Sequence, residues 1–155
     1  MTQMIQLETV TDANWREGLN VRATAPQARY VAGYEPVLLV ILAKSAVRAG
    51  GVDWWPFLIR EGVQVVGVVT VADRRSHDGS LGIFHLLIDR HHQRQGLGRA
   101  TVRRLVELGR HDQRCRALRL TVDPDNASAI ALYESAGFTV MGTNNDGELQ
   151  MTLPL

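Results

Sequence analysis

The chain has 155 residues and a net charge of +1, and 45% of its residues are hydrophobic and 21% are charged. This length is typical of one domain, and we predict a single domain over residues 1–155. So small a net charge excludes a protein that holds nucleic acid or an anionic membrane by its overall positive charge. The single cysteine, Cys115, excludes an internal disulfide and fits a reducing compartment. Because residues 1–9 are too polar for a signal peptide, we predict a cytoplasmic protein.

The N-terminal half is predicted to form a strand, two helices and an antiparallel meander of three strands. Alternating residues at 5–10 indicate the first strand, and Thr11 or Asp12 then caps a helix over about 13–21. Residues 25–36 follow no regular pattern. A second helix over about 36–49 begins at Pro36 and ends at Gly50 and Gly51. The runs that form the meander, with polar turns between them, are 55–60, 64–72 and 80–88.

Helices and strands alternate in the C-terminal half. An apolar stripe predicts a helix over 98–111, and a further helix over 126–136 ends at Gly137. The strands predicted around these helices are 117–122, 138–142 and 148–153. A meander followed by a β-α-β crossover predicts an α/β (α+β) fold with a mixed, mostly antiparallel sheet and helices on both faces.

The loop that follows the strand at 80–88 is predicted to bind a phosphate group. Its sequence is Gln93-Arg94-Gln95-Gly96-Leu97-Gly98-Arg99, and it opens the helix at 98–111. Such a loop points backbone N–H groups at one place, at the positive end of the helix dipole, and glycines allow an anion to approach closely. A glycine pair can also merely shape a tight turn, and this motif alone leaves that alternative open. A Rossmann fingerprint fits poorly, because its third glycine position holds Thr101.

Two motifs together resemble the GNAT superfamily of N-acetyltransferases. Gln93-x-x-Gly96-x-Gly98 is similar to the (Arg/Gln)-x-x-Gly-x-(Gly/Ala) signature of that family. The segment from Asn126 to Phe138 resembles its Asn-x-x-Ala-x-x-x-Tyr-x-x-x-Gly-Phe helix and strand. The order of predicted elements matches over essentially the whole chain, with one departure, Arg90 where the family often has proline. The resemblance implies a sheet of about seven strands that splays between the fourth and fifth strands.

The resemblance also implies acetyl-CoA as co-substrate and a set of residues that bind it. Backbone amides of the loop would hold the pyrophosphate, and the end of the preceding strand would pair with the pantetheine arm. A backbone N–H near Leu87 or Ile88 would stabilise the thioester oxygen. The implied cofactor-binding residues are Leu86, Leu87, Ile88, Gln93, Arg94, Gln95, Gly96, Leu97, Gly98, Arg99 and Asn126.

Acetylation of an amine needs a proton acceptor and a donor for the leaving thiolate. The resemblance makes Tyr133 the proton donor, although spacing alone favours a core tyrosine. His85 is a candidate base because its ordinary pKa suits that role, with a histidine bonded inside the sheet as the alternative. Asp73 and His77 are weaker candidates. No metal site is predicted, since His91 and His92 lack partners at metal-ligand spacing.

The acceptor is predicted to be a small amine, bound by aromatic and acidic side chains of the N-terminal half. The candidates are Trp15, Glu17, Tyr34, Glu35 and Trp54, for which core packing or a solvated face is the alternative. The overall pattern resembles bacterial spermine and spermidine acetyltransferases. An aminoglycoside, an amino acid or a protein N-terminus stays open as acceptor, as do a non-catalytic CoA-binding module and a nucleotide-binding oxidoreductase. Family members often form homodimers, but the sequence specifies no interface.

Overall fold

The sheet of this protein has seven strands in the order β1-β2-β3-β4-β5-β7-β6. The computed structural model describes residues 4–155, so the first three residues of the polar 1–9 segment lie outside it. Neighbouring strands are antiparallel except for β4 and β5, which are parallel. The strands are β1 (Ile5–Thr9), β2 (Trp54–Glu61), β3 (Gln64–Arg74), β4 (Ser80–Ile88), β5 (Ala117–Val122), β6 (Thr139–Thr143) and β7 (Leu149–Pro154).

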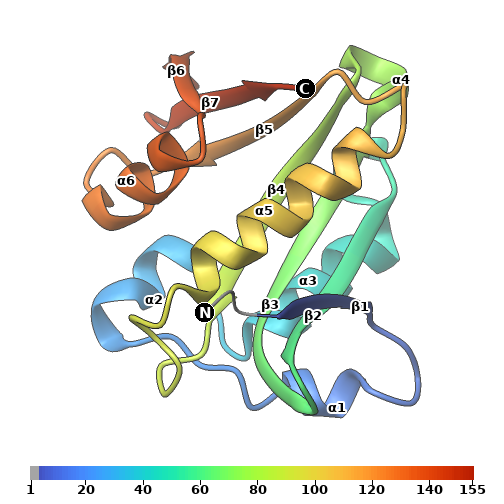
Figure 1. Ribbon diagram of the computed structural model, residues 1–155, viewed down its shortest axis with the longest axis vertical. Coiled ribbons are helices and arrows are strands. Elements are labelled where there is room, and N and C mark those ends of the chain that lie inside the picture. The colour runs from blue at the N-terminus through green and yellow to red at the C-terminus, as the bar shows by residue number, and fades with distance from the viewer. Residues whose placement is uncertain (1–3) are drawn as a thin grey trace.

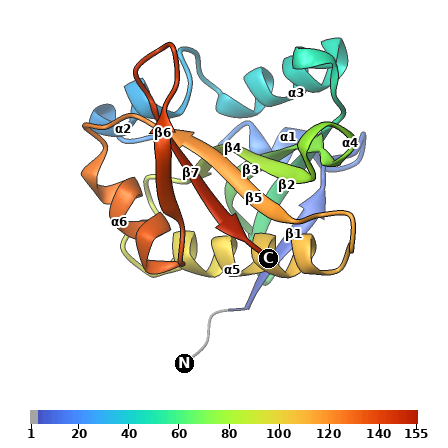
Figure 2. The ribbon, with the colours of Figure 1, turned by 90° about the horizontal axis from the view of Figure 1, so that it is seen from above.

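Helices cover both faces of the sheet, as predicted (Figures 1 and 2). On one face lie α5 (Leu97–Arg110) and α6 (Ala127–Ser135), and on the other lie α2 (Ala25–Val31) and α3 (Val37–Val47). The short elements are α1 (Trp15–Gly18), the 3-10 turn η1 (Ala49–Gly51) and α4 (Arg75–Asp78). Because both faces are covered, the interior strand β3 is buried from Val66 to Ala72. In the described part of the chain, no helix is both long and apolar enough to cross a membrane.

Two of the N-terminal helices differ from the prediction. The first is only four residues long and ends at Gly18, where an added Cβ would lie 2.6 Å from Cδ2 of Leu38. The second, α2, occupies residues predicted to be irregular. This helix has Pro26 in its first turn, a position that proline favours. None of its residues is fully buried, so the sequence shows no apolar stripe that would predict a helix here. The missed helix matters because α2 forms one wall of the site.

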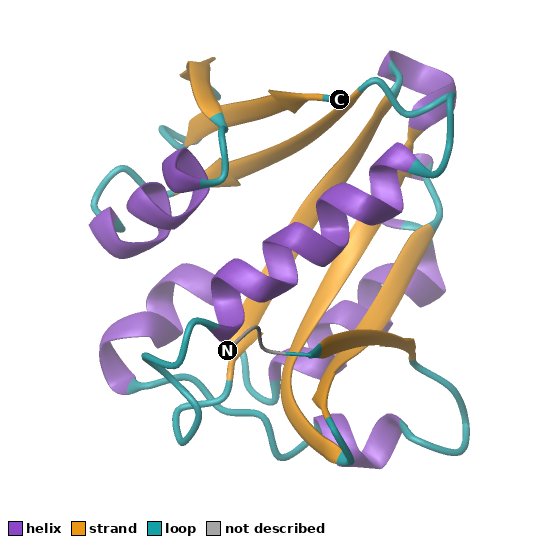
Figure 3. Ribbon diagram, viewed as in Figure 1, coloured by secondary structure: helices purple, strands orange, loops and turns teal. Residues whose placement is uncertain are grey.

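The sheet opens between β4 and β5, as the family resemblance implies. The two strands pair only through Ser80–Gly82 with Ala117–Arg119, and then diverge (Figure 3). At the point of divergence β4 has a bulge: Thr70 of β3 pairs with Phe84 and Val68 pairs with Leu87, so His85 and Leu86 together face one residue of β3. His85 adopts the left-handed conformation, with φ 53°. Beyond Gly82, β4 therefore has no partner on its β5 side and carries the bulge, which leaves a slot between the two strands.

Candidate active site

A cavity of about 520 Å³ lies in the slot between β4 and the C-terminal part of the fold. The end of β4, the N-terminus of α5 and one side of α6 line it, with Gln27 and Tyr30 of α2 across from them. Gly96 caps α5 with φ 77° and Arg94 has φ 62°, so two left-handed residues turn the loop into the helix. Backbone N–H groups at such a helix N-terminus attract an anion. The loop predicted to bind phosphate therefore faces a cavity of the size that ligands occupy.

Two side chains hold this loop in place. The amide of Gln93 donates to the carbonyl of Ile88 (3.0 Å) and to Oε1 of Gln27 (2.6 Å), which ties the loop to β4 and α2. Asp89, 6% exposed, accepts from the backbone N–H groups of Arg22 (2.8 Å) and His91 (3.0 Å). Burial alone would raise the pKa of Asp89, but these N–H groups outweigh it and lower the pKa. Gln93 was predicted to bind the cofactor, and its side chain holds the loop against β4 and α2.

Gly98 and Asn126 position α5 and α6 beside the cavity. A Cβ on Gly98 would lie 3.3 Å from Cδ2 of Leu132, so this glycine lets α6 pack closely on α5. Asn126 caps α6, its side chain accepting from the N–H of Ala129 at 3.3 Å. Both residues, which were predicted to bind the cofactor, line the cavity and shape its walls.

Tyr133 lies where the large cavity meets a smaller one. Its side chain is 9% exposed, packs edge-on against Phe138, and borders both the large cavity and a neighbouring cavity of about 150 Å³. Burial raises the pKa of Tyr133 to about 12, so the phenol is neutral at physiological pH and can donate a hydrogen bond. The smaller cavity is also lined by His85 and by two carboxylates, Asp123 and Glu148.

Both ring nitrogens of His85 are engaged. Nδ1 lies 2.6 Å from the carbonyl oxygen of Val31, and since a carbonyl only accepts, Nδ1 carries the proton. Nε2 then accepts from the ammonium of Lys44, 2.8 Å away. Burial, outweighing the bond to Val31, lowers the pKa of His85, and the charge of Lys44 lowers it further. In this arrangement the imidazole is neutral and offers no free lone pair to a substrate, which agrees with the alternative of a histidine bonded inside the sheet.

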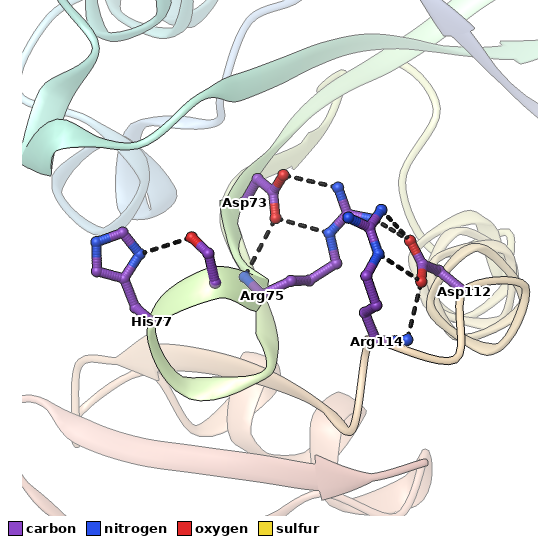
Figure 4. Close-up of polar contacts among 6 residues, drawn as sticks. Asp73, Arg75, His77, Asp112 and Arg114 are labelled. Carbon is purple, nitrogen blue, oxygen red and sulfur yellow. Dashed lines mark hydrogen bonds and ion pairs between the residues drawn. The ribbon is translucent and has the colours of Figure 1, made fainter.

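The weaker base candidates lie at the closed end of the sheet, beside α4 (Figure 4). Asp73 accepts two hydrogen bonds from Arg75, each 2.7 Å, and Arg75 also contacts Asp112, which Arg114 holds at 2.8 Å. Hydrogen bonds from Arg75 lower the pKa of Asp73. His77 points away from this cluster, beside Ser76. The structure therefore places neither residue at the slot.

The predicted acceptor-binding residues are not brought together. Glu17 on α1 pairs with Arg60, and Trp15 stacks on Arg16 beside it, so both are occupied outside the slot. Tyr34 is 80% exposed, and Glu35 accepts from the backbone N–H of Ala23 (3.1 Å). Trp54 alone of the five lies near the smaller cavity, against Phe84 of its wall.

The site residues that were not predicted from the sequence include Lys44, Glu148 and the residues that α2 brings to the slot. Lys44 lies on α3, which was predicted, and it is the only lysine of the chain, a signal that was visible without the structure. Nothing in the sequence indicates that it meets His85, because the two residues are 41 positions apart. Gln27 and Tyr30 were missed along with their helix.

A match to a known protein family identifies the family of this fold and site. The model of the Acetyltransferase (GNAT) family matches residues 22–138, which spans the meander, the loop and α6. The chain is a member of the GNAT family. The slot, the loop and α6 all lie in the matched region.

Relatives of this GNAT protein differ in length and in the acceptors that their names state. N-acetyltransferase 8 of Homo sapiens is 34% identical over 102 residues, which are 65% of this chain and 44% of that protein. The chain thus spans about half the length of such relatives. The probable spermine N(1)-acetyltransferase of Bacillus subtilis subsp. natto is 24% identical over 138 residues, covering 89% of this chain and 90% of that protein. A crystal structure of an aminoglycoside acetyltransferase in complex with coenzyme A is 25% identical, with a TM-score of 0.76, covering 97% of this chain and 95% of that one.

Proposed function

We propose that this GNAT protein transfers the acetyl group of acetyl-CoA to the primary amine of a small molecule, by direct attack in a ternary complex. The observation that carries the proposal is the meeting of two cavities at Tyr133. The larger has the glycine loop for a pyrophosphate, and the smaller has carboxylates that attract an ammonium group. Relatives named for spermine and aminoglycosides support an amine as acceptor.

In the larger cavity, backbone groups of the protein would bind acetyl-CoA. Arg94 to Arg99 would present N–H groups to the pyrophosphate at the start of α5, and Leu86 to Ile88 would pair with the pantetheine arm. The bulge at His85 and Leu86 turns backbone toward the slot just where β5 no longer pairs with β4. An N–H group of this segment would stabilise negative charge on the thioester oxygen during attack.

The acceptor side supplies negative charge and water access. An alkyl ammonium is only roughly one part in a thousand neutral at pH 7, and the neutral amine is the species that attacks. Asp123 and Glu148 would concentrate the ammonium form in the smaller cavity. The bound ammonium first loses one proton to water, and the neutral amine then attacks the thioester carbon. Once the carbon–nitrogen bond forms, the nitrogen becomes much more acidic, and its second proton passes through water to these carboxylates. Because both ring nitrogens of His85 are engaged, His85 does not accept this proton and only helps to position the groups around it.

Tyr133 would act on the leaving thiolate. The neutral phenol donates a hydrogen bond to the sulfur as the carbon–sulfur bond breaks, and then a proton. A pKa of about 12 makes full transfer to a free thiolate uphill, since a thiol has a pKa near 8.5. Burial of the thiolate in the same slot raises its own pKa and narrows this difference.

The test is a pair of measurements on the purified chain. Acetyl-CoA should raise the melting temperature while NAD does not, which separates a CoA site from a dinucleotide site. Release of free CoA thiol is then measured with a panel of amines that includes spermine, an aminoglycoside and amino acids. Thiol release that depends on an amine supports the proposal. Binding of acetyl-CoA with no amine-dependent release would instead identify a non-catalytic CoA-binding module.

A further inference from the structure

Lys44 lies against two residues that line the smaller cavity, and within residues 4–155 the hydrogen-bond and aromatic partners of its ammonium are neutral groups. Its Nζ lies 2.8 Å from Nε2 of His85, 5.3 Å from the ring centroid of Trp54 and 5.6 Å from that of Phe84. Within residues 4–155, no carboxylate makes an ion pair with this ammonium. An imidazole and two aromatic faces stabilise a cation without neutralising it. The site is therefore ready to accept a negative charge.

Burial makes this charge unfavourable by itself. Lys44 is half-buried, and burial lowers its pKa, while the charge of Glu148 acts in the opposite direction. A partly desolvated ammonium gains most from a direct anionic partner that also replaces lost hydration. Glu148 is near enough to influence Lys44 but not to pair with it, and its Oε1 is instead bonded to the amide of Asn144 at 3.2 Å.

Lys44 lies next to the region where we propose that the acceptor binds. Phe84 and His85, which hold its ammonium, are wall residues of the smaller cavity, and Phe84 also lines an adjoining groove of about 310 Å³. The other cations of that groove are already paired, since Arg74 and Arg119 each lie 3.5 Å from Asp78. The acceptor region thus has carboxylates close to Tyr133 and one unneutralised ammonium on the α3 side.

We propose that Lys44 binds a carboxylate of the acceptor, so that the acceptor is a small amine that also carries a carboxylate, as an amino acid does. This inference rests on the proposed acetyltransferase function. The ammonium end of such a molecule complements Asp123 and Glu148, and its carboxylate complements Lys44. A polyamine would instead bring a second ammonium group toward Lys44, where like charges repel.

The experiment compares acids with their own amides as acceptors. The pairs are glycine and glycinamide, β-alanine and β-alaninamide, and γ-aminobutyrate and γ-aminobutyramide, measured by release of CoA thiol. In each pair the size is matched and only the carboxylate charge is lost. We expect at least one pair in which kcat/KM for the acid exceeds that for the amide by about tenfold to a hundredfold, the range of a charge-assisted hydrogen bond.

Variants of Lys44 test whether this residue causes the preference for the acid over its amide. Lys44→Met keeps an apolar side chain of similar length and should abolish the preference by lowering kcat/KM for the acid only. Lys44→Arg should retain part of it. Arg110→Met, an exposed charge at the far end of α5, is the matched control and should change neither substrate. A melting-temperature shift by acetyl-CoA verifies that each variant is folded.

The outcomes separate the two proposals. If wild-type protein acetylates amines without preferring any acid over its amide, the carboxylate inference is overturned and the acetyltransferase function stands. If Lys44→Met lowers kcat/KM equally for acid and amide, Lys44 supports the site structurally and does not bind the acceptor. If none of these amines, spermine included, releases CoA, the proposed function itself fails.

Discussion

His85 and Lys44 meet through Nε2 and Nζ at 2.8 Å, while the carbonyl of Val31 accepts from Nδ1 on the other side of the ring. The contact joins the bulge of β4 to α3 across the acceptor side of the slot. It assigns the histidine a positioning task, because the ring has no lone pair left for a substrate proton. The first prediction follows from this contact.

His85→Asn should weaken acceptor use without removing a titrating base. Asparagine tolerates the left-handed backbone at this position but cannot reach both partners. We expect kcat/KM for the amine to fall about tenfold, the effect of one lost hydrogen bond to a charged group. The pH profile of kcat/KM should keep its shape, since both ring nitrogens are engaged and burial lowers the pKa of His85, so this ring is not the group that titrates in the profile. Disappearance of the acidic limb of the profile would restore His85 as the general base.

Tyr133→Phe should lower turnover and leave donor binding intact. The phenyl ring keeps the packing against Phe138, so stability changes little. Loss of the proton donor should reduce kcat by about a hundredfold, the lower end of general acid contributions. Isothermal titration with acetyl-CoA should give a Kd within about twofold of wild type. Unchanged kcat would remove the phenol from the mechanism.

Gly96→Ala should weaken acetyl-CoA binding through the backbone alone. Gly96 has φ 77°, a conformation that costs alanine about 1 kcal/mol, and relief of that strain would turn the loop N–H groups away from the pyrophosphate. We expect Kd for acetyl-CoA to rise about tenfold or more. The control is Gly62→Ala in the β2–β3 turn, where φ is 62° and an added Cβ meets no atom within 4 Å. Both variants should lose similar stability, and equal loss of acetyl-CoA affinity in the two would contradict the assignment.

Arg75→Met should destabilise the fold at neutral pH and less so in acid. Its hydrogen bonds lower the pKa of Asp73, so this contribution to stability is present above the unfolded pKa, near 4, and is lost as pH falls through the lower folded pKa. We expect the free energy of unfolding to drop by about 1–2 kcal/mol at pH 7. Urea titrations at neutral pH and near pH 3 measure both values.

The control for Arg75 is its neighbour. Arg74 is more exposed and lies 3.5 Å from Asp78, so Arg74→Met should cost less than about 0.5 kcal/mol at either pH. A loss at Arg75 that stays constant from pH 7 to pH 3 would mean that its stacking on Trp55, and not its ion pairs, carries the effect.

Elements whose signal is local were predictable. The strands at 80–88 and 117–122 were predicted with the bounds they have in the structure, because one apolar run bounded by polar turns specifies each of them. The α2 helix was missed because its residues contact the slot without being fully buried, so no periodic stripe marks it. The four-residue α1 was predicted too long, since its end at Gly18 depends on the distant side chains of Leu38 and Leu58.

By itself, the sequence determined the loop and the helix N-terminus that we propose bind the donor. Loop glycines and helix N-termini act through backbone atoms of consecutive residues, so Gly96, Gly98 and the start of α5 were recognisable without coordinates. Only the tertiary structure decided the acceptor half. The smaller cavity is lined by His85 of β4, Asp123 after β5 and Glu148 before β7, and Lys44 of α3 contacts His85. Side chains that meet across such a slot share no spacing in the sequence, so nothing in the sequence predicts that these four residues lie near one another.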